Sequence, residues 1–66
     1  MSIVKVIEII SEGDNVENAV AAAVEEASKT VRNIKTVYVK DIQAIVQDNK
    51  VTKYRIDAKV SFVVGK

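Results

Sequence analysis

The feature that most restricts the fold of this chain is a regular alternation of apolar and polar side chains over residues 51–64. A period of two is typical of a β-strand with one buried face. One face would carry Tyr54, Ile56, Ala58, Val60, Phe62 and Val64, and the other Lys53, Arg55, Asp57, Lys59 and Ser61. The apolar face therefore needs another element to cover it.

Two further segments have the composition of strands. Residues 3–10 are β-branched at six of eight positions and are too short for a helix. The segment 35–46 alternates less regularly, with Val37 and Val39 on one face and Ile42, Ala44 and Val46 on the other. This change of face predicts a bulge or bend near Lys40 and Asp41, and suggests that another subunit buries the second half of the strand.

The last two strands are joined by the short segment Gln47-Asp48-Asn49-Lys50. Aspartate and asparagine tolerate positive φ better than most residues do. The spacing therefore predicts a two-residue hairpin turn at Asp48 and Asn49.

A segment of high helix propensity lies between the first two strands. The turn residues 11–15 precede it, and Asp14 with Glu17 three positions later resembles a capping box in which Asp14 is the N-cap. Apolar residues then recur at steps of three and four, namely Val16, Val20, Ala23, Ala27, Val31 and Ile34. This spacing predicts one amphipathic helix over about 15–32.

These elements predict an α+β fold with the order β-α-β-β, in one domain that spans residues 1–66. A helix between the first two strands leaves room for the third strand between them, so we expect a three-stranded antiparallel sheet in the order 1-3-2. The helix would cover one sheet face. The other face, which carries Thr36, Tyr38, Lys53, Arg55, Asp57 and Lys59, is mixed polar and would be solvated or salt-bridged to a neighbouring subunit.

Composition limits how such a chain can be stabilised and what it can do. With 66 residues and no cysteine or histidine, it lacks disulfides and the usual zinc ligands, which favours self-association as the stabilising device. The absence of histidine and cysteine also excludes the common nucleophilic triads, so we do not expect an enzyme. A net charge of +1 argues against nucleic acid as a partner. The apolar runs are too short for a membrane span or a signal peptide, so we expect a cytoplasmic protein.

The order and lengths of these segments resemble the dodecin family across almost the whole chain. The resemblance rests on residues 4–10, the turn Ser-Glu-Gly-Asp at 11–14, the alanine-rich helix, and the motifs at 54–56 and 60–62. It implies a hollow shell of twelve identical subunits, in which each sheet wraps its own helix. Many members hold flavins such as riboflavin and FMN between subunits, where they store or sequester them.

The residues that hold the flavin in such relatives are replaced in this sequence. The resemblance aligns their stacking tryptophan with Thr36 and their flavin-bonding glutamine with Arg55. An arginine can still bond the flavin carbonyls, and Tyr38 is the aromatic residue that could replace the tryptophan. The flavin-type site implied by the resemblance therefore consists of Thr36, Tyr38 and Arg55.

A second branch of the family, the calcium dodecins, also lacks the tryptophan and resembles this chain more closely in its third strand. It implies an alternative function, a structural or calcium-associated shell that binds no flavin. The candidate oxygen ligands are Glu12, Asp14 and Glu17, with Asp48 in the hairpin. The competing interpretation is that Asp14 and Glu17 cap a helix and Asp48 forms a turn.

Overall fold

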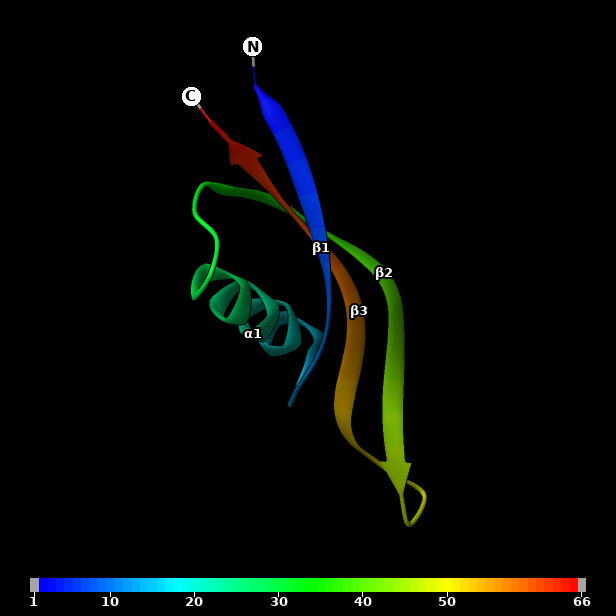
Figure 1. The fold of residues 1–66 in the computed structure, drawn as a ribbon. Helices are drawn as coiled ribbons and strands as arrows, with labels where there is room; N and C mark the ends of the chain where they lie inside the picture. Colours follow the sequence, from blue (N-terminus) through cyan, green and yellow to red (C-terminus); the bar gives the residue numbers. More distant parts are fainter. Residues whose placement is uncertain (1, 66) are drawn as a thin grey trace.

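The computed structural model describes residues 2–65 and contains four elements. They are β1 (Ile3–Gly13), α1 (Val16–Ser28), β2 (Ile34–Gln47) and β3 (Lys50–Val64). The three strands form one antiparallel sheet in the order β1-β3-β2, with α1 against one face (Figure 1). The predicted fold class, element order and strand order are confirmed. The strands extend one to three residues beyond the predicted ends, most of all β1, which continues through the predicted turn to Gly13.

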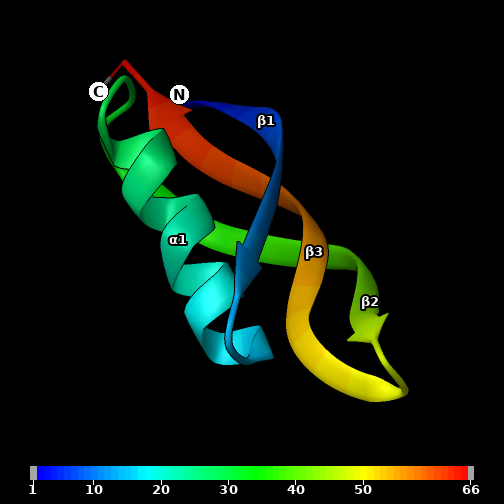
Figure 2. The ribbon, with the colours of Figure 1, turned by 90° about the horizontal axis from the view of Figure 1, so that it is seen from below.

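The buried core lies between the central strand and the helix. On β3, the side chains of Ile56, Ala58 and Val60 are fully buried, and Ile56 and Ala58 form one cluster with Ala19 and Ala23 of α1. The view from below shows α1 running along this side of the sheet (Figure 2). The alternation in β3 therefore identified the buried face correctly. Near its ends the cover is incomplete, because Tyr54 and Phe62 are partly buried and Val64 is exposed.

The predicted bulge in β2 is confirmed, since the register with β3 shifts between Val39 and Asp41. Lys40 is the extra residue, so Ile42 pairs with Ile56 and faces the same side as Val39. The bulge thus keeps the apolar residues of both halves of β2 on the face that carries the helix. Ile42 is nevertheless 57% exposed, because the β2–β3 hairpin projects beyond the end of α1 (Figure 1).

The hairpin turn also has the predicted geometry. Asp48 has φ 52° and Asn49 has φ 63°, both in the left-handed region. Positive φ at both central residues is the requirement of a type I′ turn, whose twist matches that of the adjoining strands. These two residues therefore set the register of β2 against β3 at the turn end of the hairpin.

The helix begins one residue later than predicted, and its N-cap is Asn15 rather than Asp14. The side-chain oxygen Oδ1 of Asn15 accepts a hydrogen bond from the backbone N–H of Asn18 at 2.7 Å. The capping box expected from Asp14 and Glu17 is therefore wrong, because β1 continues to Gly13 and moves the cap position along the chain. Glu17 lies in the first turn of α1, where a negative charge interacts favourably with the helix dipole.

This assignment of the cap predicts different effects at neighbouring positions. Asn15→Ala removes the acceptor for the Asn18 N–H and should lower the free energy of unfolding by about 1 kcal/mol. Asp14→Ala should change it by less than about 0.5 kcal/mol, because Asp14 is exposed and does not cap the helix. Thermal melts of the two variants at one protein concentration test this. A larger loss of unfolding free energy in Asp14→Ala than in Asn15→Ala would show that Asp14, not Asn15, is the N-cap.

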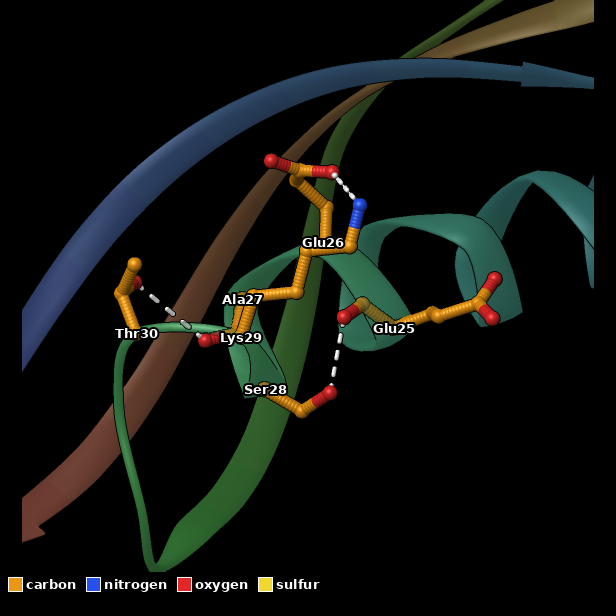
Figure 3. Close-up of polar contacts among 6 residues, drawn as sticks. All are labelled: Glu25, Glu26, Ala27, Ser28, Lys29 and Thr30. Carbon is orange, nitrogen blue, oxygen red and sulfur yellow. Dashed lines mark hydrogen bonds and ion pairs between the residues drawn. The ribbon is translucent and has the colours of Figure 1, made fainter.

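The helix ends at Ser28, four residues before the predicted end. Its last turn is closed by local contacts: Ser28 Oγ donates to Glu25 O at 2.7 Å, and Lys29 Nζ pairs with Glu26 Oε1 at 3.1 Å (Figure 3). Asn33, with φ 62°, then redirects the chain into β2. Within residues 2–65, no helix is long and apolar enough to cross a membrane.

Candidate functional site

The predicted flavin-site residues lie on the sheet face opposite α1. Since Ile56, Ala58 and Val60 point toward the core, the intervening residues of β3 and their cross-strand partners point away from the helix. We call this surface the outer sheet face. It comprises Val4, Val6, Glu8, Ile10 and Glu12 of β1, Thr36, Tyr38, Asp41 and Gln43 of β2, and Arg55, Asp57, Lys59 and Ser61 of β3.

Thr36 and Tyr38 lie next to each other on the outer sheet face, as expected. Thr36 pairs with Ser61, and their hydroxyl oxygens are 2.5 Å apart. Tyr38 is opposite Lys59 and is 64% exposed. Together they present an open aromatic ring beside a pair of hydroxyl groups, which suits a planar ligand with polar edges.

Arg55 lies on the same face but is bound within its own subunit. Its Nη2 is 2.7 Å and its Nε 2.8 Å from Glu12 Oε2, while Lys53 Nζ is 2.8 Å from Glu12 Oε1. Hydrogen bonds from Lys53 and then from Arg55 hold the pKa of the Glu12 carboxyl below its ordinary value. Both cations thus share one carboxylate at the edge of the sheet.

One subunit does not bring all three predicted flavin-site residues together. Ser61, the partner of Thr36, is six residues from Arg55 along β3. At about 3.3 Å per residue this separates the two by about 20 Å. A single small-molecule site that uses both Thr36 and Arg55 must therefore take them from two subunits.

The predicted metal ligands do not form a convergent set in this subunit. Glu12 is bonded to two cations, Asp14 is exposed before the helix, and Glu17 lies in the first turn of α1. Asp48 is in the turn of the projecting hairpin. Within residues 2–65, no three acidic side chains are close enough together to hold a metal ion.

The Glu12 ion pairs predict how stability depends on pH. A carboxylate with a lowered pKa stabilises the folded state above its unfolded pKa of about 4.3, and this contribution is lost as the pH falls through the folded value. Glu12→Gln should therefore melt at a lower temperature than the unmodified protein at about pH 7 and at a similar temperature at about pH 2. Glu25→Gln is the matched control and should show little of this pattern, because Glu25 is exposed and belongs to none of the ion pairs formed within residues 2–65. Equal losses at both pH values would contradict the ionic contribution.

Two acidic residues on the outer sheet face were not predicted as a pair. Asp41 and Asp57 are direct cross-strand partners, and Oδ1 of Asp57 is buried without a hydrogen-bond partner among residues 2–65. Like charges in this position destabilise a sheet. The bulge at Lys40 determines which residue lies opposite Asp57, so sequence alternation alone does not reveal the pair.

Comparison with known proteins gives matches along nearly the whole chain. The family model described as Dodecin matches residues 3–65. A mutant of the Thermus thermophilus dodecin is 25% identical, with full coverage of both chains and a TM-score of 0.90. The dodecin from Streptomyces coelicolor is 26% identical over 98% of this chain and 94% of its own, with a TM-score of 0.88.

A third structure, the dodecin from Streptomyces davaonensis, shows the same fold at lower identity. It is 20% identical over 98% of this chain and 97% of its own, with a TM-score of 0.88. Among curated proteins, none matches the chain. Because the family model covers all three strands and the helix, this chain belongs to the dodecin family.

Proposed function

We propose that this protein forms a shell of twelve subunits that binds a flavin-type ligand between subunits and stores or sequesters it. Dodecins are small flavin-binding dodecameric proteins that catalyse no reaction. What is specific to this chain is the binding surface. It uses Tyr38 in place of the tryptophan that the resemblance aligns with Thr36, so we expect weaker binding than in tryptophan-containing relatives.

The exposed surface of the isolated subunit supports assembly. The subunit exposes 4958 Å². A compact monomer of 7.2 kDa exposes about 4,100 Å². The excess of about 850 Å² is similar to the area of about 800 Å² that one partner buries in a standard interface. Large apolar side chains contribute to it on β1, β2 and β3, namely Ile3, Val4, Val6, Ile10, Ile42, Val46, Val51 and Val64.

The single observation that carries the ligand proposal is the exposure of Tyr38. An aromatic ring that is 64% exposed on a sheet face offers a stacking surface of the kind that a flavin ring requires. Stacking of this kind contributes about 1–3 kcal/mol per ring. The hydroxyl pair of Thr36 and Ser61 lies at one side of the ring, where it offers hydrogen bonds to a polar ligand edge.

Titration of riboflavin and of FMN with the assembled protein tests this proposal. We expect flavin fluorescence to be quenched in a saturable way, because stacking on an aromatic side chain quenches the excited ring. Tyr38→Ala should abolish the quenching, and Tyr38→Trp should retain it, because the indole is also an electron-rich ring that quenches a stacked, excited flavin. Unchanged flavin emission with an assembled protein would reject flavin binding.

The alternative is a shell that binds no flavin, and the engagement of Arg55 favours it. Arg55 is held by Glu12, so a ligand must compete with an existing ion pair for the guanidinium. The calcium-associated form of this alternative, and with it the closer similarity to the tryptophan-lacking branch, stays a prediction. A higher melting temperature with calcium than with a chelator would support it, and equal melting temperatures would reject it.

The cytoplasmic location also stays a prediction.

A further inference from the structure

Lys59 is an exposed cation beside the stacking ring of the proposed site. It lies directly opposite Tyr38 on the neighbouring strand, and both side chains belong to the outer sheet face. Side chains opposite each other in an antiparallel pair have Cβ atoms about 4.5–5.5 Å apart. The long, flexible stem of a lysine can therefore bring its ammonium group to the edge of a ligand that is stacked on Tyr38.

No carboxylate of the same subunit neutralises Lys59 by direct contact. None of the ion pairs formed within residues 2–65 includes it, although Asp57 lies two residues away on the same face. Its cross-strand partner on β1 is Glu8, which is paired with Lys40 at 3.9 Å. The ammonium group is therefore available to an anion that comes from outside the subunit.

Charge is distributed unevenly over the outer sheet face. Between Lys59 and the end of β3 that carries the C-terminus, the members of this face are uncharged, namely Val4, Val6, Thr36 and Ser61. The carboxylates of Glu12, Asp41 and Asp57 lie on the other side of Lys59, toward the hairpin. Lys59 is thus the charged residue directly beside the ring, and these three carboxylates lie farther along the sheet.

A phosphate group suits this position better than a neutral polar group does. An ammonium group is a compact charge with several N–H donors and is a common ligand of phosphate in proteins. The hydroxyl groups of Thr36 and Ser61 already offer hydrogen bonds to a neutral ligand edge. The charge of Lys59 therefore adds most affinity for a ligand that carries a negative charge of its own.

We infer that Lys59 is a specificity-determining residue, which makes the site prefer a planar aromatic ligand with a phosphate group over the same ring without one. FMN and riboflavin are such a pair. The flavin ring stacks on Tyr38, and the phosphate oxygens of FMN accept hydrogen bonds from the Lys59 ammonium group. This inference rests on the ligand binding in the proposed function and specifies the class of ligand.

Parallel fluorescence titrations with FMN and riboflavin test the inference, because the two ligands differ only in the phosphate. At low ionic strength the unmodified protein should bind FMN about tenfold more tightly than riboflavin, as expected for one hydrogen bond between charged groups. The preference should largely disappear at about 1 M salt, where the Debye length is about 3 Å. Lys59→Gln should weaken FMN binding by about tenfold and leave riboflavin binding unchanged.

Two further variants separate the position of the charge from its presence. Lys59→Arg keeps a cation beside Tyr38 and should keep most of the preference for FMN. Lys50→Gln removes the same charge from the start of β3 in the hairpin and should leave both affinities unchanged. Light scattering confirms that each variant has the same assembly as the unmodified protein.

Two results overturn the inference while leaving the proposed function in place. One is equal weakening of FMN and riboflavin binding in Lys59→Gln, which would indicate a structural role for the side chain. The other is an unmodified protein that binds both flavins equally well at low ionic strength. If the assembled, unmodified protein bound neither flavin, the proposed function would fail and the inference with it.

Discussion

Thr36→Trp is expected to tighten riboflavin binding by about 5- to 150-fold, which corresponds to about 1–3 kcal/mol of added stacking. Position 36 is exposed on the outer sheet face and next to Tyr38 in the same row, so an indole ring can be accommodated without entering the core. The change removes the hydrogen bond between the hydroxyl groups of Thr36 and Ser61. This bond is exposed and contributes little to the stability of the fold. Fluorescence titration with riboflavin measures the effect.

The matched control for this prediction is Thr36→Val. Valine has the shape of threonine and also loses the contact with Ser61, but it adds no aromatic ring. We therefore expect no gain in affinity from Thr36→Val. If the tryptophan variant assembled normally and bound riboflavin no better than the valine variant, the outer sheet face would not form an open flavin site.

Gly13→Ala is expected to destabilise the fold by about 1–3 kcal/mol, because it inserts a methyl group into a close contact between β1 and α1. A Cβ at this position would lie 2.6 Å from the backbone N of Ala19 and 2.9 Å from the carbonyl carbon of Asn18. Both atoms belong to the helix backbone, so relief requires α1 to move away from the sheet. For a chain of this size we expect the melting temperature to fall by about 5–20 °C.

Asp14→Ala is the control for this prediction, because Asp14 is the next residue and is exposed. Its melting temperature should stay close to that of the unmodified protein. All melts are compared at one protein concentration, since association changes the apparent stability. A Gly13→Ala protein as stable as the Asp14→Ala control would show that α1 can shift from β1 at little cost.

Much of this fold is predictable because its strands have simple periodic patterns. The alternation in β3 identified the core residues Ile56, Ala58 and Val60, and the break in the alternation of β2 identified the bulge at Lys40. The hairpin turn was predictable because Asp48 and Asn49 are residues that accept positive φ. In each case a local rule and the tertiary structure agree.

The ends of the helix were not predictable to the residue. Asp14 and Asn15 are both good N-cap residues, and the choice depends on how far β1 continues before the chain turns. At the other end, the apolar spacing continues through Val31 and Ile34, although α1 ends at Ser28. Val31 lies in the connection and Ile34 begins β2, so the apolar spacing continues past the end of the helix without marking it.

Contacts between side chains on different strands required the register. Glu12 lies opposite Arg55 because β1 is three residues longer than its apolar segment indicates, and the sequence places Glu12 in a turn instead. The same holds for Asp41 and Asp57, whose pairing depends on the extra residue in β2. The sequence pattern places Thr36, Tyr38 and Arg55 on one face, as the structure does, but it contains no information on the distances between them.

Light scattering coupled to size-exclusion chromatography tests the assembly of twelve subunits most directly. The chain has a mass of 7.2 kDa, so a dodecamer has a mass of about 86 kDa. We expect one main species of that mass at micromolar protein concentration. A main species at the mass of a monomer or a dimer would contradict the shell, and with it a ligand site built between subunits.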